Sequence, residues 1–111
     1  MVRDFFTGQN FLDVDTPIRI PAPAPEPFIA AHPAGDWYLQ TSPELSMKRL
    51  LAAGYPKIFQ ICKCFRKEER GRRHLEEFTM LEWYRVGEDY TVLMDDCAAF
   101  LRLAAETAGA D

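Results

Sequence analysis

Two segments of the sequence carry side chains that could bind a nucleotide between them. Arg66 and Glu68 lie two residues apart in the first segment, and Phe78, Glu82 and Tyr84 are separated by even numbers of residues in the second. Because successive side chains of a strand point to opposite faces, each group shares one face if its segment is extended. A solvent face rarely shows two aromatic rings, and a buried face rarely shows an arginine with two carboxylates. The mixture is typical of a binding site.

These side chains suit the parts of ATP. The guanidinium of Arg66 can clamp a phosphate oxygen and offset the charge that develops at phosphorus. The ring of Phe78 can stack on a purine, by analogy with the stacking of single-stranded bases. A carboxylate can accept a hydrogen bond from an exocyclic amine or pair with a substrate ammonium. Residues 69–74 contain three arginines and His74, which could fold over a polyphosphate. Together they predict an ATP site.

Each signal also has a purely structural explanation. Arg66 and Glu68 could form an exposed charge pair that adds little to stability. Residues 69–74 could be a solvated charge run, and Phe78 could belong to the core. Glu44 could be no more than an acidic residue in the first turn of a helix, where the helix dipole favours it. The joint spacing of these residues is what favours the binding site.

A hairpin is predicted to hold the two segments side by side. Residues 57–68 and 76–86 alternate in character with the period of a strand, and the polar residues between them include Gly71. Two such runs joined by a short polar loop form an antiparallel hairpin. A helix is predicted to precede it over 43–53.

Helix and strand boundaries follow from capping residues and from proline. Ser42 is a good N-cap for the helix over 43–53, Pro43 suits its first position, and Gly54 suits its end. Met1–Gly8 is predicted to be the end of a helix, with Gly8 in a left-handed conformation. Strands are expected over 11–15 and 37–40. The proline-rich stretch 20–33 is expected to be a loop.

A second long helix is predicted after the hairpin, over about residues 90–108, with Asp89 as its N-cap. The residues expected on its apolar face are Val92, Leu93, Cys97, Phe100, Leu101 and Leu103. The residues expected on the opposite, polar face are Asp95, Asp96, Arg102 and Glu106. Helices beside an antiparallel hairpin make the predicted fold class α+β.

Composition limits the class of protein. The 111 residues allow one small domain, and 48% hydrophobic residues are enough for a core. A net charge of −4 argues against a protein that coats nucleic acid, which usually needs a basic surface. The three cysteines lack the spacing of a zinc site, so reduced thiols are expected. No signal peptide or membrane span is expected, and the protein is predicted to be cytoplasmic.

The hairpin sequence resembles the second signature motif of class II aminoacyl-tRNA synthetases, which reads F-R-x-E, a loop, then R or H-x-x-x-F. The corresponding residues are Phe65-Arg66-Lys67-Glu68 and His74-Leu75-Glu76-Glu77-Phe78. Residues 3–17 are similar to the tail of the first motif. The segments Thr41-Ser42-Pro43-Glu44 and Glu82-Trp83-Tyr84 resemble the lysyl-tRNA synthetase group, and most of all its short paralogues that ligate (R)-β-lysine to elongation factor P.

The resemblance implies a reaction in which a carboxylate and ATP give an acyl-adenylate and pyrophosphate before transfer to an acceptor. It implies that Arg66 holds the α-phosphate, that Glu68 meets the adenine amine or the substrate amine, and that His74 reaches the distal phosphates. Phe78 would stack on adenine. Ser42 and Glu44 would lie beside the backbone-type amine of lysine or β-lysine, and Glu82 and Tyr84 would receive its side-chain ammonium.

The same resemblance implies that residues 1–111 are the N-terminal part of a class II catalytic domain, with the tail of motif 1 and motif 2 but without motif 3. The Mg²⁺ ligands are expected in the missing C-terminal part, and a homodimer is expected to cover exposed sheet edges. Lys67 and the pair Leu75-Glu76 depart from the usual asparagines and proline of the group. The chain alone is therefore expected to be inactive.

Three other functions remain open from the sequence. The chain could be part of a genuine lysyl-tRNA synthetase, with tRNA-Lys as its acceptor. It could be a non-catalytic remnant kept for dimerisation or binding. It could also bind RNA through the basic residues 66–74, in which case its affinity should fall steeply with salt.

Overall fold

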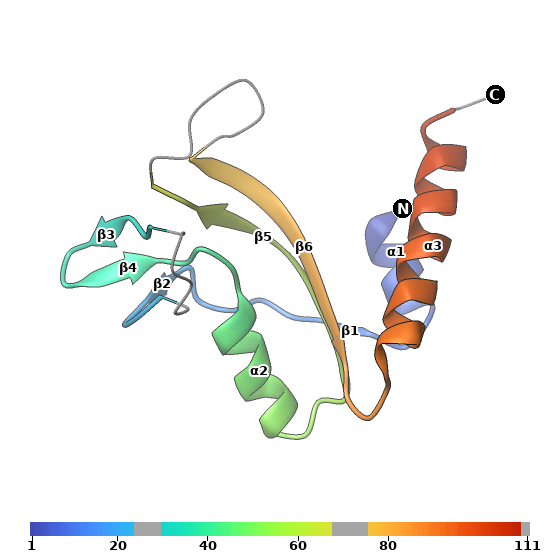
Figure 1. The fold of residues 1–111 in the computed structure, drawn as a ribbon, viewed down its shortest axis with the longest axis horizontal. Helices are drawn as coiled ribbons and strands as arrows, with labels where there is room; N and C mark the ends of the chain where they lie inside the picture. The colour runs from blue at the N-terminus through green and yellow to red at the C-terminus, as the bar shows by residue number, and fades with distance from the viewer. Residues whose placement is uncertain (24–29, 68–75, 110–111) are drawn as a thin grey trace.

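The computed structural model describes residues 1–23, 30–67 and 76–109 and has an α+β fold (Figure 1). The helices are α1 (Val2–Thr7), α2 (Glu44–Ala52) and α3 (Tyr90–Thr107). The strands are β1 (Leu12–Asp13), β2 (Arg19–Ile20), β3 (Pro33–Ala34), β4 (Trp37–Leu39), β5 (Lys57–Phe65) and β6 (Glu77–Arg85). Within these described residues, no helix is long and apolar enough to cross a membrane.

The β5–β6 hairpin is the central element of the fold and confirms the antiparallel pair predicted from the sequence. The two strands pair along their whole length, from Lys57 opposite Arg85 to Phe65 opposite Glu77. Beyond the last pair, the Arg66 amide donates a hydrogen bond of 2.8 Å to the Glu76 carbonyl. Alternate side chains in each segment therefore lie on opposite faces of the sheet, as the sequence pattern predicted.

The sheets contain pairings that the sequence did not predict. Strand β1 joins the hairpin in parallel with β5, which gives the order β1-β5-β6. Strands β2 and β3 both pair antiparallel with β4 in a second, smaller sheet. The ends of the proline-rich stretch thus form short edge strands where a loop was expected, and proline at an edge removes no central hydrogen bond.

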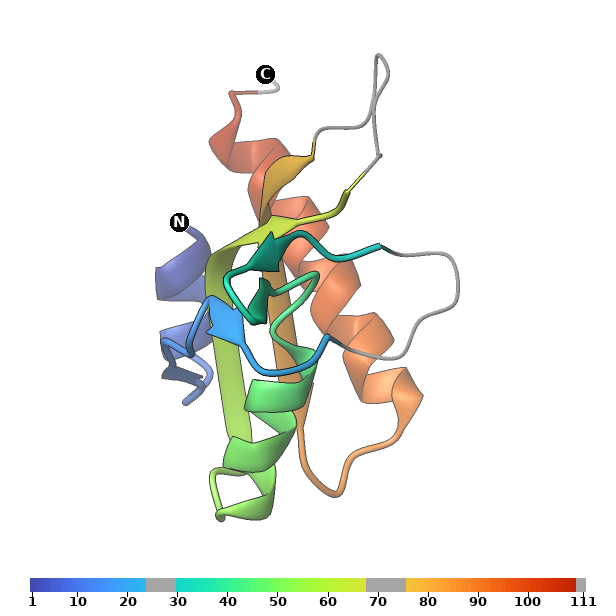
Figure 2. The ribbon, with the colours of Figure 1, turned by 90° about the vertical axis from the view of Figure 1, so that its left-hand side faces the viewer.

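The hairpin has a covered face on each side. Helix α2 and the small sheet lie on one side of it, while α1 and α3 lie on the other (Figures 1 and 2). On the α1–α3 side, Phe6 is fully buried and stacks on Phe59 with ring centroids 4.9 Å apart. Phe11, Trp83 and Phe100 contact the same ring of Phe6. This aromatic cluster fixes the helices against the hairpin.

Helix α3 begins as predicted but turns a different face inward. The Asp89 carboxylate accepts a hydrogen bond of 2.9 Å from the Thr91 amide, which confirms the N-cap. The predicted apolar face is wrong at two positions, because Cys97 is exposed and Leu101 is 65% exposed. Asp96, which was expected on the polar face, is buried with an exposure of 4%.

Asp96 turns inward because it has an ionic partner there. Arg85 at the end of β6 donates two hydrogen bonds to its carboxylate, from Nε at 2.7 Å and from Nη2 at 2.8 Å. The inward-facing positions of the helix then recur every three or four residues: Val92, Leu93, Asp96, Ala99, Phe100, Leu103 and Ala104. Hydrophobicity alone could not reveal this stripe.

The two predicted helix ends near glycine and serine differ from expectation. Gly8 has φ −63° and is right-handed, while Asn10 takes the positive φ of 67° that reverses the chain into β1. Pro43 rather than Ser42 occupies the N-cap position of α2, and Ser42 Oγ accepts a hydrogen bond from the Glu44 amide at 3.3 Å. Gly54 follows α2 with φ +108°, as its predicted role as a helix stop requires.

Candidate active site

The register of the hairpin brings four predicted site residues to one surface. Phe78 lies opposite Cys64, two residues from Arg66, while Glu82 lies opposite Gln60 and Tyr84 opposite Ile58. Directly opposed residues share a face of an antiparallel pair. We call this surface the site face; it consists of the even-numbered positions of 58–66 and 78–84.

Arg66 and Phe78 are in direct contact on the site face. The guanidinium carbon of Arg66 lies 5.1 Å from the centroid of the Phe78 ring, within the range of a cation–π interaction. Arg66 Nε also approaches the Thr41 carbonyl at 3.4 Å, a long contact that ties the hairpin to the segment before α2. The prediction that Arg66 and Phe78 point to the same side of the sheet is confirmed.

Glu82 and Tyr84 form a second group further along β6. The Tyr84 hydroxyl donates a hydrogen bond of 2.8 Å to Glu82 Oε2. Burial of the phenol, followed by this bond to a carboxylate, raises the pKa of Tyr84 above its ordinary value. Tyr84 is therefore a neutral hydroxyl that orients a carboxylate.

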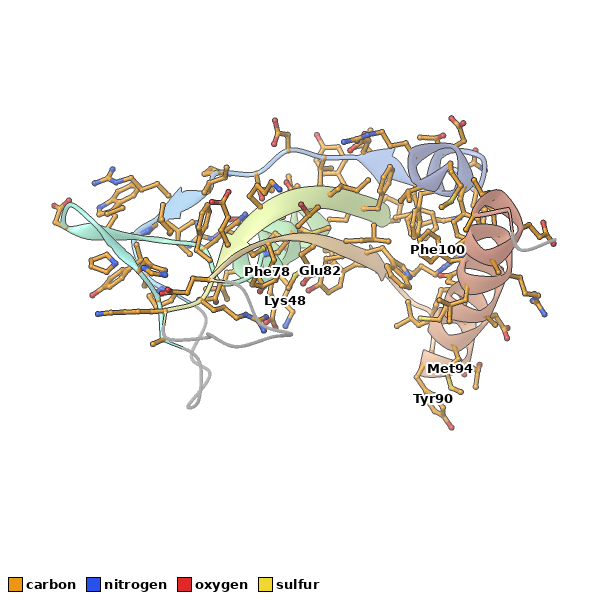
Figure 3. The ribbon with its side chains drawn as sticks, turned by 90° about the horizontal axis from the view of Figure 1, so that it is seen from above. Lys48, Phe78, Glu82, Tyr90, Met94 and Phe100 are labelled. Carbon is orange, nitrogen blue, oxygen red and sulfur yellow. The ribbon has the colours of Figure 1, made fainter. Side chains whose placement is uncertain are left out.

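The start of α2 adds charged groups to this end of the site face. Lys48 Nζ contacts Glu44 Oε1 at 2.6 Å, one helical turn away. The hydrogen bond and the charge of Glu44 raise the pKa of Lys48, and the charge of Glu82 adds to the effect. Figure 3 labels Lys48 beside Phe78 and Glu82, away from Tyr90 and Met94 on α3. Carboxylates from α2 and β6 thus act on one ammonium group.

Two predicted site residues, Glu68 and His74, lie outside the described residues, as does the loop of residues 69–74. Their roles stay predictions. Ser42 and Glu44 lie at the start of α2, where Glu44 contacts Lys48, and the charge of Glu82 also raises the pKa of Lys48. Lys48 itself was not predicted as a site residue, although its position four residues after Glu44 indicates an ion pair.

Polar and sulfur-bearing side chains lie on the site face between these two groups. Cys62 Sγ and Cys64 Sγ are 3.8 Å apart, and Cys64 Sγ lies 4.0 Å from Met80 Sδ. Below them the buried Gln60 side chain accepts hydrogen bonds from the amide and hydroxyl of Thr16. None of these residues is among the predicted site residues.

The arrangement fits the chemistry of a nucleotide that carries an activated carboxylate. The guanidinium of Arg66 can bind a phosphate while the neighbouring ring of Phe78 stacks on a base. Carboxylates further along the strand can bind an ammonium group. Within the described part of the chain, no three His, Cys, Asp or Glu side chains gather to hold a metal ion.

The family model of the class II tRNA synthetases of the D, K and N group matches residues 1–110. The chain is a member of that family. The residues that resemble motif 2 lie on the hairpin, and β1 lies within the residues that resemble the tail of motif 1.

The similar proteins are ligases named for lysine chemistry. The chain is 44% identical to the elongation factor P–(R)-β-lysine ligase of Pseudoalteromonas translucida, over 96% of the chain and 36% of that protein. It is 46% identical to the same ligase of Photobacterium profundum, over 92% of the chain and 35% of that protein. It is 42% identical to the lysine–tRNA ligase of Thiobacillus denitrificans, over 96% of the chain and 22% of that protein. The chain therefore spans about a third of the first two relatives and about a fifth of the third.

Proposed function

We propose that this chain supplies the ATP- and lysine-contacting part of a ligase that activates lysine or (R)-β-lysine and transfers it to elongation factor P. The observation that carries the proposal is the contact of Arg66 with the Phe78 ring, on the same face as the Glu82–Tyr84 pair. The names of the relatives supply the amino acid and the acceptor. Residues 1–111 would be the N-terminal part of the catalytic domain.

At the nucleotide end, Arg66 and Phe78 act together. The lysine carboxylate attacks the α-phosphorus of ATP, the bond to the β-phosphate oxygen breaks, and pyrophosphate leaves with the electron pair. Arg66 offsets the negative charge that builds up on the α-phosphate oxygens. Adenine stacks on the Phe78 ring, and a phosphate binds the Arg66 guanidinium. These two contacts replace the cation–π contact between Arg66 and Phe78. Glu68 and His74 would complete this end, and Mg²⁺ would neutralise the phosphates.

At the amino-acid end, the carboxylates recognise an ammonium group. Glu82 is oriented by the Tyr84 hydroxyl, and Glu44 already binds the ammonium of Lys48. Lys48 thus stands where a cation is electrostatically favoured, which supports recognition of a lysine-like substrate in its surroundings. Ser42 lies beside Glu44 and would contact the backbone-type amine of the lysine or β-lysine substrate.

Nucleotide binding is the direct test, because Arg66 and Phe78, the two residues on which the proposal depends, both lie in this chain. ATP affinity is measured by calorimetry for the chain, for Arg66→Ala and for Phe78→Leu. We expect Phe78→Leu to weaken binding by roughly 5–150-fold, from a stacking energy of roughly 1–3 kcal/mol. Arg66→Ala should weaken it by a similar or larger factor. Lys63→Ala, an exposed residue of β5 on the opposite face, is the matched control.

Two results decide the proposal. If Arg66→Ala and Phe78→Leu bind ATP as tightly as the parent chain, or if Lys63→Ala loses as much affinity as they do, the site assignment is wrong. In a protein that contains the whole catalytic domain, ATP–pyrophosphate exchange should depend on lysine or (R)-β-lysine and should fall with the same two variants.

Part of a lysine–tRNA ligase is the second candidate, supported by 42% identity to such an enzyme. The acceptor distinguishes the two, because labelled lysine or β-lysine is transferred either to elongation factor P or to tRNA-Lys. The homodimer is also a proposal: β6 ends the order β1-β5-β6 of the described strands, so a second copy could cover that edge. Sedimentation at several concentrations tests it.

A further inference from the structure

The sulfur atoms in the middle of the site face have no role in the proposed reaction. Cys62 and Cys64 lie two residues apart on β5, and Met80 on β6 is the residue directly opposite Cys62. We call these three residues the sulfur cluster. Cys64 is fully buried, Cys62 and Met80 are partly buried, and none of the cysteines forms a disulfide.

We propose that the sulfur cluster is a binding site for a soft monovalent cation of the Cu(I) type, held by the Cys62 and Cys64 thiolates and the Met80 thioether. Thiolate and thioether sulfur are soft ligands, which favour soft metal ions such as Cu(I). The proposal concerns metal binding and does not depend on the proposed ligase activity.

The spacing of the sulfur atoms carries the proposal. In a planar site, three sulfur atoms surround the cation at the corners of a triangle. With a metal–sulfur distance of about 2.3 Å, as in zinc thiolates, the sulfur atoms lie about 4.0 Å from one another. The Cys62–Cys64 distance is 3.8 Å and the Cys64–Met80 distance is 4.0 Å. The hairpin register therefore already spaces these two sulfur pairs as such a cation requires.

A disulfide between the two cysteines fits less well. Residues two apart on a strand have Cα atoms about 6.6–6.8 Å apart, at the upper limit for a disulfide. The sulfur atoms would have to close from 3.8 Å to about 2.05 Å within a strand that is paired with β6 along its whole length. A bridging cation needs no such movement.

Binding of the cation should release protons from the cysteine thiols, because a cysteine that ligates a metal does so as a thiolate.

Zinc is a weaker candidate for the same site. Structural zinc takes four nitrogen, sulfur or oxygen ligands in a tetrahedron. The described residues hold no group of three or more His, Cys, Asp or Glu side chains arranged for a metal. The third ligand here is a neutral thioether, which favours the softer cation.

The test is a competition titration of the fully reduced protein with Cu(I) and the chromogenic chelator bathocuproine disulfonate, without oxygen. We expect one tightly bound Cu(I) per chain. Cys62→Ala and Cys64→Ala should each weaken it by about 100-fold or more, and Met80→Leu, which keeps the side-chain volume, by roughly tenfold. Cys97→Ala, which removes the exposed thiol of α3, is the control and should leave affinity unchanged.

X-ray absorption at the copper edge supplies a second measurement that does not depend on the folding of a variant. Three sulfur neighbours at about 2.3 Å support the site, whereas two sulfur neighbours overturn the role of Met80. Loss of binding in Cys97→Ala, or binding no tighter than that of a Cys62→Ala/Cys64→Ala double variant, overturns the proposal. Thermal melts of each variant identify any loss that comes from unfolding.

Discussion

The ion pair between Arg85 and Asp96 is buried, so removing one partner should be among the most destabilising single substitutions in the chain. The Arg85 side chain is 11% exposed and the Asp96 side chain 5% exposed. The carboxylate accepts two hydrogen bonds from the guanidinium, at 2.7 and 2.8 Å. In Asp96→Ala the guanidinium keeps its contacts with Gln9 Oε1 at 3.2 Å and with the Phe11 ring at 4.8 Å, and neither of these groups carries a negative charge.

Loss of one partner from such a pair costs about 3–5 kcal/mol, because the other charge stays buried without compensation. A domain of this size has a total stability of about 5–15 kcal/mol, so the variant would be marginally stable. At roughly 4 °C per kcal/mol, the melting temperature should fall by about 12–20 °C. Urea unfolding followed by circular dichroism measures the free energy directly.

Two further variants separate this explanation from a general weakness of α3. Asp95→Ala changes the exposed neighbour of Asp96 and should alter stability by less than about 0.5 kcal/mol. Replacement of both partners, by Arg85→Met with Asp96→Leu, should be less damaging than Asp96→Ala alone, since no charge is left buried. The reasoning is refuted if Asp96→Ala unfolds within 1 kcal/mol of the parent, or if the double variant is the least stable of the three.

Two other predictions concern the site face. The pKa of Tyr84 is raised in the folded chain by burial and by Glu82, so its stabilising effect is complete below the unfolded pKa near 10 and is lost as pH rises above it. Urea melts between pH 9 and 11 should therefore show a steeper fall for the parent than for Tyr84→Phe, and equal slopes would contradict the shift. Gln60→Met should cost about 1–3 kcal/mol because it leaves the buried Thr16 amide without its 2.6 Å hydrogen bond, and a neutral result in the same assay would mean that Thr16 finds another acceptor.

Local patterns in the sequence were sufficient for the main elements and for the site face. The alternation of residue types in 57–68 and 76–86 predicted the hairpin, and with it the shared face of Arg66 and Phe78. Asp89 and Gly54 marked helix ends because capping depends on neighbouring residues. The family likeness came from the same short motifs and is confirmed by the match over residues 1–110.

Features that depend on distant partners could not be predicted in the same way. Asp96 looked like a surface residue until Arg85 of β6 was placed beside it, since a buried carboxylate is stable only with its partner. The parallel pairing of β1 with β5 joins residues more than forty positions apart, and two residues are too few to show a strand period. The sulfur cluster likewise required the register that sets Met80 opposite Cys62.

The sequence by itself determined which segments are helical or extended, which side chains share a strand face, and which family the chain belongs to. These properties follow from dihedral preferences and side-chain period, and both are local. Only the tertiary structure decided which face of α3 is buried, how the small sheet forms, and which atoms lie within bonding distance across the hairpin. Those outcomes depend on packing and charge pairing between elements, which no single segment contains.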